Sequence, residues 1–167
     1  MEASRKKSKE CAVRLQVMEA KVTRVSEGMR FDASVRSVVA LQSVAFGTFV
    51  CADNKDNLVC DRSKIGKWEK FKCIPMGENK VGFQSEAFKK YVSVDRKGKA
   101  TADKPHLKGH EKFEVVLNDD GSVSLMSFRG CYLMAQPDGR MTATKNDSGK
   151  PTAWERFMIS VIRLESQ

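Results

Sequence analysis

The chain has 167 residues, enough for one globular domain, and a formal net charge of +9 at pH 7. Its composition, with 41% hydrophobic and 31% charged residues, is not that of a disordered protein. No apolar run approaches the roughly 20 residues that would span a membrane. The excess of basic residues favours an acidic partner, such as a protein filament, an anionic lipid or nucleic acid.

Residues 1–36 are predicted to form a basic N-terminal tail, with nine Lys or Arg residues against five Asp or Glu residues. Within residues 11–29, apolar side chains recur at alternating spacings of four and three, as in a heptad pattern: Cys11, Leu15, Met18, Val22, Val25 and Met29. This pattern fits a helix packed on the domain or a helix that self-associates. The alternation of Val13, Leu15 and Val17 also fits a strand, and disorder stays open as well.

Two serines of the tail, Ser4 and Ser8, lie among basic residues. A phosphate on either serine would cancel part of the positive charge of the tail. We therefore name them as candidate sites of regulation by phosphorylation.

Five cysteines, an odd number, are spread over the chain: Cys11, Cys51, Cys60, Cys73 and Cys131. No apolar segment follows the basic first ten residues, so we expect no secretory signal and a cytoplasmic protein. Thiols in that compartment are kept reduced, and all five are predicted to be free. Cys51 and Cys60 fall in neighbouring predicted strands and are the pair most able to form a bridge.

From residue 39 onward the sequence repeats itself three times. VALQSVAFGTFVCADNKDNLVCD starts at residue 39, VGFQSEAFKKYVSVDRKGKATAD at residue 81 and VSLMSFRGCYLMAQPDGRMTAT at residue 123. The corresponding positions include Leu41, Phe83 and Leu125; Ser43, Ser85 and Ser127; Phe49, Tyr91 and Tyr132; and Cys60, Ala102 and Ala143. Each copy ends on a similar motif, at Trp68-Glu69-Lys70-Phe71, His110-Glu111-Lys112-Phe113 and Trp154-Glu155-Arg156-Phe157. Such a period indicates units that bury their apolar faces only together.

Short stretches of alternating apolar and polar residues, separated by turn residues, predict about four strands in each copy. For the first copy we expect strands over residues 39–44, 48–52, 57–61 and 69–74. About twelve strands without a helical pattern between them favour a closed antiparallel assembly. We therefore predict an all-β protein with a β-trefoil fold over residues 37–167. It consists of three four-stranded repeats of about 42 residues that form a six-stranded barrel with a hairpin cap.

The repeat segments VALQSVAFGTFVCADNKDNLVCDR and GFQSEAFKKYVSV, and the recurring Trp/His-Glu-x-Phe ending, resemble the repeat unit of the fascin family. Fascins are actin-bundling proteins built from four β-trefoils, whereas this chain has the length of one. The resemblance covers residues 39–163. It implies a β-trefoil fold and a cytoskeletal, non-enzymatic function in binding actin filaments.

Other chemistry has little support in the sequence. His106 and His110 lie in a loop without a third ligand, so we expect no metal site, and we expect no cofactor. Trp68 and Trp154 are residue types that bind sugars, but the Gln-x-Trp signature of ricin-type lectins does not occur. We interpret Trp-Glu-x-Phe as the last strand of each copy, with Phe71, Phe113 and Phe157 in the barrel. Glu69, Glu111 and Glu155 would then lie far apart around the barrel, and we predict no enzyme.

The candidate binding site is a basic surface contributed by the first two copies, with the third copy poorer in basic residues. Its residues are Lys64, Lys67, Lys70, Lys89, Lys90, Arg96, Lys97 and Lys99. We predict that they bind an actin filament or another acidic protein surface with an affinity that falls as salt is added.

Two alternatives stay open: a lectin-like carbohydrate-binding domain, and a growth-factor-like ligand of anionic glycans. We do not expect nucleic acid as a partner, because the lysines are not interleaved with aromatic residues for base stacking.

Overall fold

In the computed structural model, which describes residues 30–145 and 149–165, twelve strands follow one another along the chain from β1 to β12. The first copy contributes β1 (Ser37–Ser43), β2 (Phe49–Ala52), β3 (Leu58–Arg62) and β4 (Phe71–Pro75). The second contributes β5 (Lys80–Ser85), β6 (Tyr91–Val94), β7 (Ala100–Lys104) and β8 (Phe113–Leu117). The third contributes β9 (Val123–Met126), β10 (Leu133–Ala135), β11 (Met141–Ala143) and β12 (Phe157–Leu164).

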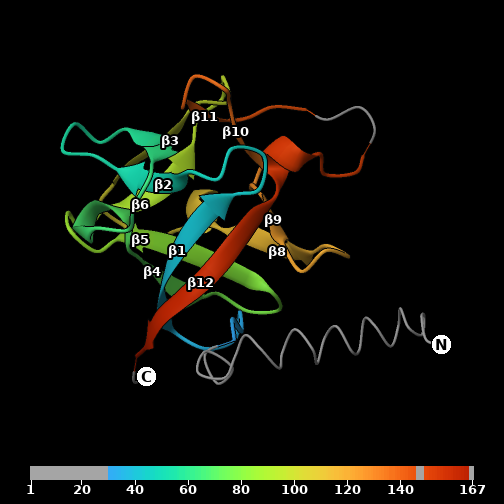
Figure 1. Cartoon of the computed structure of the whole chain (residues 1–167). Coiled ribbons are helices and arrows are strands. Elements are labelled where there is room, and N and C mark those ends of the chain that lie inside the picture. The colour runs from blue at the N-terminus through green and yellow to red at the C-terminus, as the bar shows by residue number, and fades with distance from the viewer. Residues whose placement is uncertain (1–29, 146–148, 166–167) are drawn as a thin grey trace. The chain divides into compact units, whose positions relative to one another are not determined.

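Six of these strands close into a barrel by antiparallel pairing of each with two others (Figure 1). The pairs run from β1 to β4, β4 to β5, β5 to β8, β8 to β9, β9 to β12 and back to β1. The remaining strands form three hairpins, β2–β3, β6–β7 and β10–β11, one from each copy. A closed barrel with one cap hairpin per copy is a β-trefoil, as the period of the sequence predicts.

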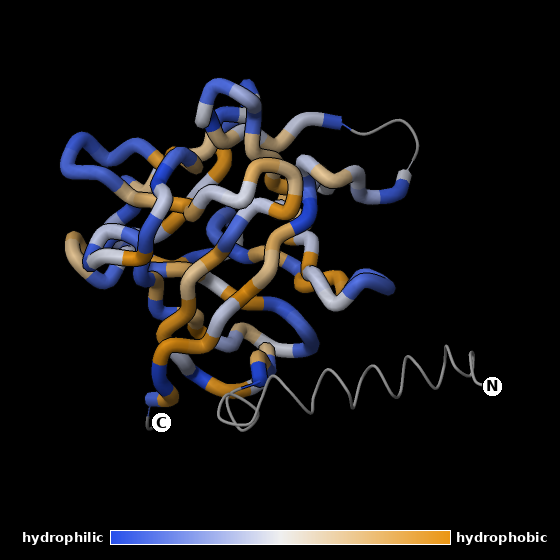
Figure 2. Tube along the Cα trace, viewed as in Figure 1, coloured by the Kyte–Doolittle hydropathy of each residue, from blue (hydrophilic) through white to orange (hydrophobic). Residues whose placement is uncertain are grey.

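The barrel is filled by the residues that recur in the sequence, and the hydrophobic segments in Figure 2 follow its strands. The side chains at the first matched position, Leu41, Phe83 and Leu125, are at most 3% exposed. The phenylalanines that end the three copies, Phe71, Phe113 and Phe157, are at most 1% exposed. Their burial confirms that these phenylalanines lie in the core.

One prediction about these strands is wrong. The Trp-Glu part of each closing motif forms a short 3-10 helix before the barrel strand, not the strand itself. These helices are η3 (Lys67–Glu69), η4 (Gly109–Glu111) and η5 (Ala153–Glu155). A turn of three residues is too short to give a periodic pattern, so alternation alone cannot distinguish it from the start of a strand.

The tips of the three hairpins meet around the pseudo-threefold axis. Three equivalent backbone hydrogen bonds join them in a ring, from Cys60 N to Gly139 O, from Ala102 N to Asp56 O and from Ala143 N to Gly98 O, at 2.8–3.0 Å. Asp56, Gly98 and Gly139 all have positive φ, between 67° and 91°. At Gly98 a Cβ would lie 3.0 Å from the carbonyl oxygen of Ala143, so glycine permits the close approach of two copies.

The candidate sites in the tail, Ser4, Ser8 and the segment 11–29, lie outside the described residues, as does Cys11. The boundary between a tail at 1–36 and a domain at 37–167 stays a prediction. No helix in the described part of the chain is long and apolar enough to cross a membrane.

Candidate functional site

Adjacent copies are joined on the surface by ring pairs that the sequence interpretation missed. Trp68 of copy one packs on Phe88 of copy two, with ring centroids 5.4 Å apart. His110 of copy two stacks on Phe128 of copy three at 4.2 Å, and Trp154 of copy three packs on Phe46 of copy one at 5.9 Å. Each pair includes one residue of a 3-10 helix and one phenylalanine of the next turn.

These pairs explain why a histidine replaces tryptophan in the second copy, since His110 takes the same place and makes the same kind of contact. The prediction that the tryptophans belong to the last strand of each copy fails, because Trp68 lies in η3 and Trp154 in η5, before the barrel strands. Trp68 is half-buried and Trp154 is 39% exposed. The partners were detectable in the sequence. Phe46 and Phe88 are 42 residues apart, and Phe128 falls near the same position of the third copy.

Buried polar groups hold the ring pairs in place from both sides. In two copies a serine hydroxyl accepts the backbone N–H of the stacking phenylalanine, from Phe46 to Ser43 at 3.1 Å and from Phe88 to Ser85 at 3.0 Å. The recurring serine therefore shapes the turn that presents the ring.

On the other side, the buried glutamates Glu69, Glu111 and Glu155 are at most 6% exposed. Each accepts the backbone N–H three residues earlier, from Gly66, Lys108 and Thr152, at 2.6–2.8 Å. The three carboxylates therefore serve to close the 3-10 turns in the three copies.

Three predicted site residues lie where copy one meets copy two, and we call them the junction cluster: Lys67, Lys70 and Lys89. Lys64 lies in the loop before η3. Lys67 and Lys70 flank Trp68, and Lys89 follows its partner Phe88. The backbone N–H of Glu86 donates to the carbonyl oxygen of Lys70 at 3.0 Å, which ties the two segments together. Lys64, Lys67 and Lys89 are exposed, and Lys70 is half-buried.

Three further predicted residues, Arg96, Lys97 and Lys99, occupy the turn of the β6–β7 hairpin, and we call them the tip cluster. All three are exposed. The carboxylate of Asp95 accepts the backbone N–H groups of Lys97 and Lys99 at 2.8 and 2.9 Å, which fixes the turn that carries them.

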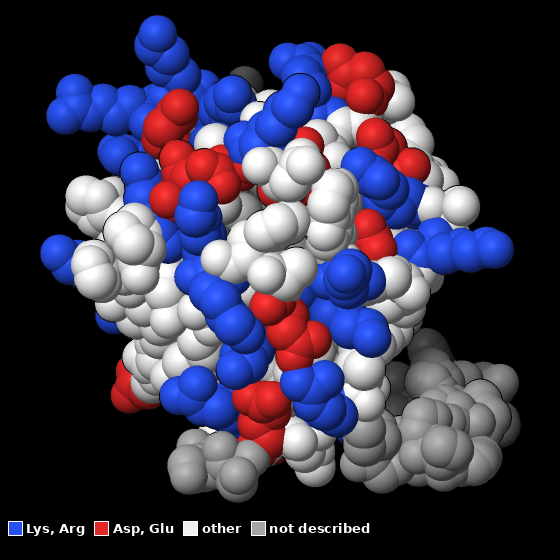
Figure 3. Space-filling view, turned by 90° about the vertical axis from the view of Figure 1, so that its left-hand side faces the viewer, with Lys and Arg blue, Asp and Glu red and all other residues white. Residues whose placement is uncertain are grey.

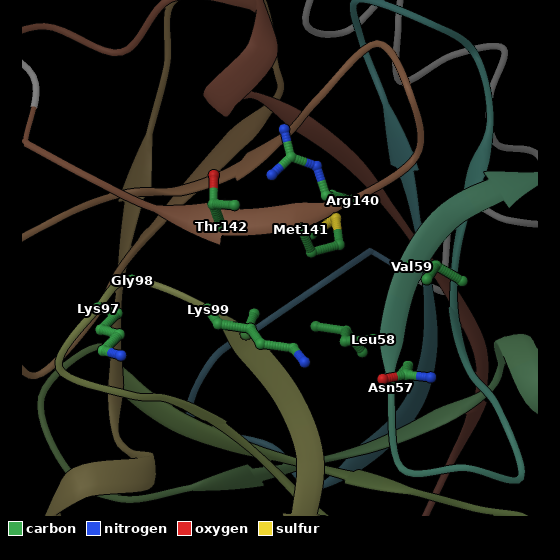
Figure 4. A pocket seen from close by; sticks show the side chains of 10 residues that line it. Asn57, Leu58, Val59, Lys97, Gly98, Lys99, Arg140, Met141 and Thr142 are labelled. Atoms are coloured by element: carbon green, nitrogen blue, oxygen red, sulfur yellow. The ribbon is translucent and has the colours of Figure 1, made fainter.

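The structure separates Lys90 from the other residues of the predicted site and adds Arg140 to them. Lys90 belongs to neither cluster, because its ammonium group pairs with Asp56 of the β2–β3 turn at 2.9 Å. Arg140 of the third copy, which the sequence analysis did not include, lines the same surface cavity as Lys97 and Lys99 (Figure 4). The basic surface therefore is not confined to the first two copies.

Charge on the face drawn in Figure 3 is mixed. Basic side chains spread over the whole face, and acidic side chains lie among them. At the junction cluster, Glu86 pairs with Arg163, which in turn pairs with Glu165 at 3.3 Å. A partner would therefore meet separate basic clusters and not one continuous patch.

No group of three or more potential metal ligands occurs among the residues that the structure describes. His110, considered in the sequence as one of a pair, is in the stack with Phe128.

The described cysteines are free, as predicted: Cys51, Cys60 and Cys73 are buried, and Cys131 is half-buried. Burial raises the pKa of Cys73 to about 12. Burial, together with a hydrogen bond to Glu69, raises the pKa of Cys51 to about 12 as well. A raised pKa keeps the thiol protonated, and the thiolate is the reactive form.

We therefore expect iodoacetamide at pH 8 to modify Cys131 well before Cys51 and Cys73. A pKa three units above an ordinary thiol lowers the thiolate fraction by about a thousandfold. Peptide mapping after timed quenching measures each site separately, and the difference should vanish in denaturant. Equal rates for Cys51 and Cys131 in the folded protein would contradict the arrangement.

Comparison with known proteins agrees with this architecture. The designed 3-fold symmetric protein ThreeFoil superposes with a TM-score of 0.65 at 10% sequence identity, over 77% of this chain and 99% of that chain. At this identity the similarity concerns the fold alone. No curated protein sequence matched the chain.

A family model, described as the FRG1-like domain, matches residues 67–157. The match begins in η3 of the first copy, ends at Phe157 and covers more than half of the chain. The fascin resemblance predicted the correct fold, but membership of the fascin family is not confirmed. The chain belongs to the FRG1-like domain family, whose fold is the β-trefoil.

Proposed function

We propose that this domain is a non-enzymatic binding module that attaches to the acidic surface of actin filaments, in the cytoplasm and at the cytoskeleton. The observation that carries the proposal is the junction cluster. Two copies bring Lys67, Lys70 and Lys89 to the sides of one partly exposed ring pair.

Cations next to aromatic rings suit a protein partner. Clustered charges within a Debye length of about 8 Å add their attraction to an acidic surface. Rings supply contact area that lysines alone lack, and aromatic residues are enriched at the positions that dominate binding energy. Hydrogen bonds to the buried side chains of Glu69 and Ser85 fix the turns that carry Trp68 and Phe88. The two rings therefore lose little conformational freedom on binding.

Bundling requires two filament sites on one molecule or on a dimer. The junction cluster and the tip cluster belong to different parts of the fold, a 3-10 helix with its neighbouring turn and a hairpin tip. We propose them as the two sites, with self-association through residues 11–29 as the other route.

Charge reversal tests the proposal. We expect K67E/K89E to reduce co-sedimentation with filamentous actin at low salt by at least about tenfold in affinity, since each good contact is worth about 1 kcal/mol or more. Stability should change little, because exposed ion pairs contribute only about 0–1 kcal/mol.

The matched control is K55E/K145E, which changes the net charge equally at two other exposed lysines. An equal loss of filament affinity in both double variants would mean that the protein binds by diffuse charge attraction and has no defined site. Binding of glycans by the unmodified protein, in the absence of filament binding, would favour the glycan alternatives.

A further inference from the structure

Side chains of the three cap hairpins line an open surface cavity of about 480 Å³ (Figure 4). Equivalent strands contribute to it, because β3, β7 and β11 each supply lining side chains. Its volume falls within the range of small-ligand sites, about 300–1,000 Å³.

The floor of this cap cavity is apolar and unequal in its three parts. Leu58, Ala100 and Met141 occupy the same position of the three copies, and all are at most 3% exposed. Two copies place a long side chain there and the second places a methyl group.

The walls are basic. Lys97, Lys99 and Arg140 line the cavity, and no acidic residue lines it among those that the structure describes. Two acidic groups in the same turns, Asp95 and Asp138, already have hydrogen-bond partners. Asp95 accepts the N–H groups of Lys97 and Lys99, and Asp138 accepts the N–H of Arg140 at 3.0 Å and its Nε at 2.8 Å. Lys97 and Lys99 form no ion pair with another described residue.

We propose that the cap cavity binds a small ring that carries two or more phosphate groups, such as a sugar or cyclitol polyphosphate, either free or as a lipid headgroup. This inference goes beyond filament binding and does not depend on it, although Lys97 and Lys99 also belong to the tip cluster. Lys97 and Lys99 of one hairpin and Arg140 of another line one space, and Arg140 is also paired with Asp138. A single carboxylate on the ligand would reach only part of these three cations. Two phosphates, each with a charge of about −1.5 to −2 at pH 7, match them together.

The apolar floor supports a ring as the body of the ligand. One face of a sugar or cyclitol ring presents C–H groups, and this face would lie over the base that Leu58, Ala100 and Met141 close. Thr142 and Asn57 place a hydroxyl and an amide at the wall, where they can hydrogen-bond ring hydroxyls. The Arg140 guanidinium offers N–H donors to phosphate beyond the Nε that Asp138 occupies.

A cavity-filling variant separates a shaped site from diffuse attraction, because it leaves every charge in place. In A100M the second copy receives the residue type that the third copy has at Met141, and we expect the domain to fold. Titration calorimetry of the full chain with inositol trisphosphate is expected to show binding that A100M weakens at least about tenfold.

Two further variants complete the test. K99Q/R140Q should weaken binding to a similar degree, which covers the case in which A100M does not fold. K67E/K89E should bind inositol trisphosphate like the unmodified protein, so that failure of this site and failure of filament binding are distinguishable. Absence of binding by the unmodified protein to both trisphosphate and vesicles, or equal affinity in A100M, would overturn the proposal.

Vesicles distinguish the two sources of the ligand. If the protein binds vesicles with phosphatidylinositol bisphosphate more tightly than free inositol trisphosphate, the ligand is a lipid headgroup. If it binds free trisphosphate more tightly, the ligand is a soluble molecule. The remaining outcome is that the protein binds phosphatidylserine vesicles of matched charge as tightly as phosphatidylinositol bisphosphate vesicles, with unchanged affinity in A100M. That result would show only adsorption on an anionic surface and would contradict the proposal.

Discussion

Replacing Phe157 by alanine is expected to lower the free energy of unfolding by about 3–5 kcal/mol. Phe157 is fully buried, and its backbone lies opposite Ser43 on one side and Val123 on the other, where the first and last barrel strands close the ring. The substitution leaves a cavity where β1, β9 and β12 meet. The neighbouring strands cannot move into this cavity without disrupting the register of their pairing. Since a domain of this size is stable by only about 5–15 kcal/mol, the loss would be a large part of the total.

Urea denaturation followed by tryptophan fluorescence measures this change. The neighbouring Met158 is 42% exposed, and M158A should alter the free energy of unfolding by less than about 0.5 kcal/mol. A loss below about 1 kcal/mol in F157A would contradict the closed barrel core.

Replacing Glu155 by alanine is expected to lower the free energy of unfolding by about 2–3 kcal/mol. Its carboxylate, 1% exposed, accepts the backbone N–H of Thr152 at 2.7 Å and its hydroxyl at 3.2 Å. Without it, the donors that close the η5 turn lose their partner, and Trp154 loses the turn that positions it against Phe46.

Glutamine at the same position separates the hydrogen bond from the charge. E155Q retains a carbonyl oxygen for the Thr152 N–H, so it should lose less stability than E155A. Equal and small losses in both variants, measured by urea denaturation, would show that this carboxylate does not hold the turn.

The barrel and the hairpins were predictable because their signals are repeated and periodic. Leu41, Phe83 and Leu125 recur at one spacing, and alternation around them marks strands that face a core. The 3-10 helices were missed because three residues carry no period, and because Trp68 and Trp154 are residue types that strands favour. Their position depends on buried glutamates, whose role becomes visible only when the hydrogen bonds are known.

The exposed basic residues of the candidate site can be read from the sequence, but the way in which the fold groups them cannot. Lys67 and Lys89 are separated by a barrel strand pair in sequence, and the ring pair between copies brings them together. Arg140 was assigned to the less basic third copy and not grouped with Lys97 and Lys99. The hairpin tips approach one another around the threefold axis, which relates residues about 40 positions apart. Aligning Asn57, Lys99 and Arg140 as equivalent positions would have placed all three at the cap.

The central claim, that this domain binds actin filaments through basic clusters, is tested most directly by co-sedimentation of the unmodified protein with filamentous actin at two salt concentrations. We expect the protein to pellet with filaments at low salt and its affinity to fall steeply as salt approaches about 0.3 M, where charges beyond about 6 Å are screened. A protein that stays in the supernatant with filaments at low salt would contradict it.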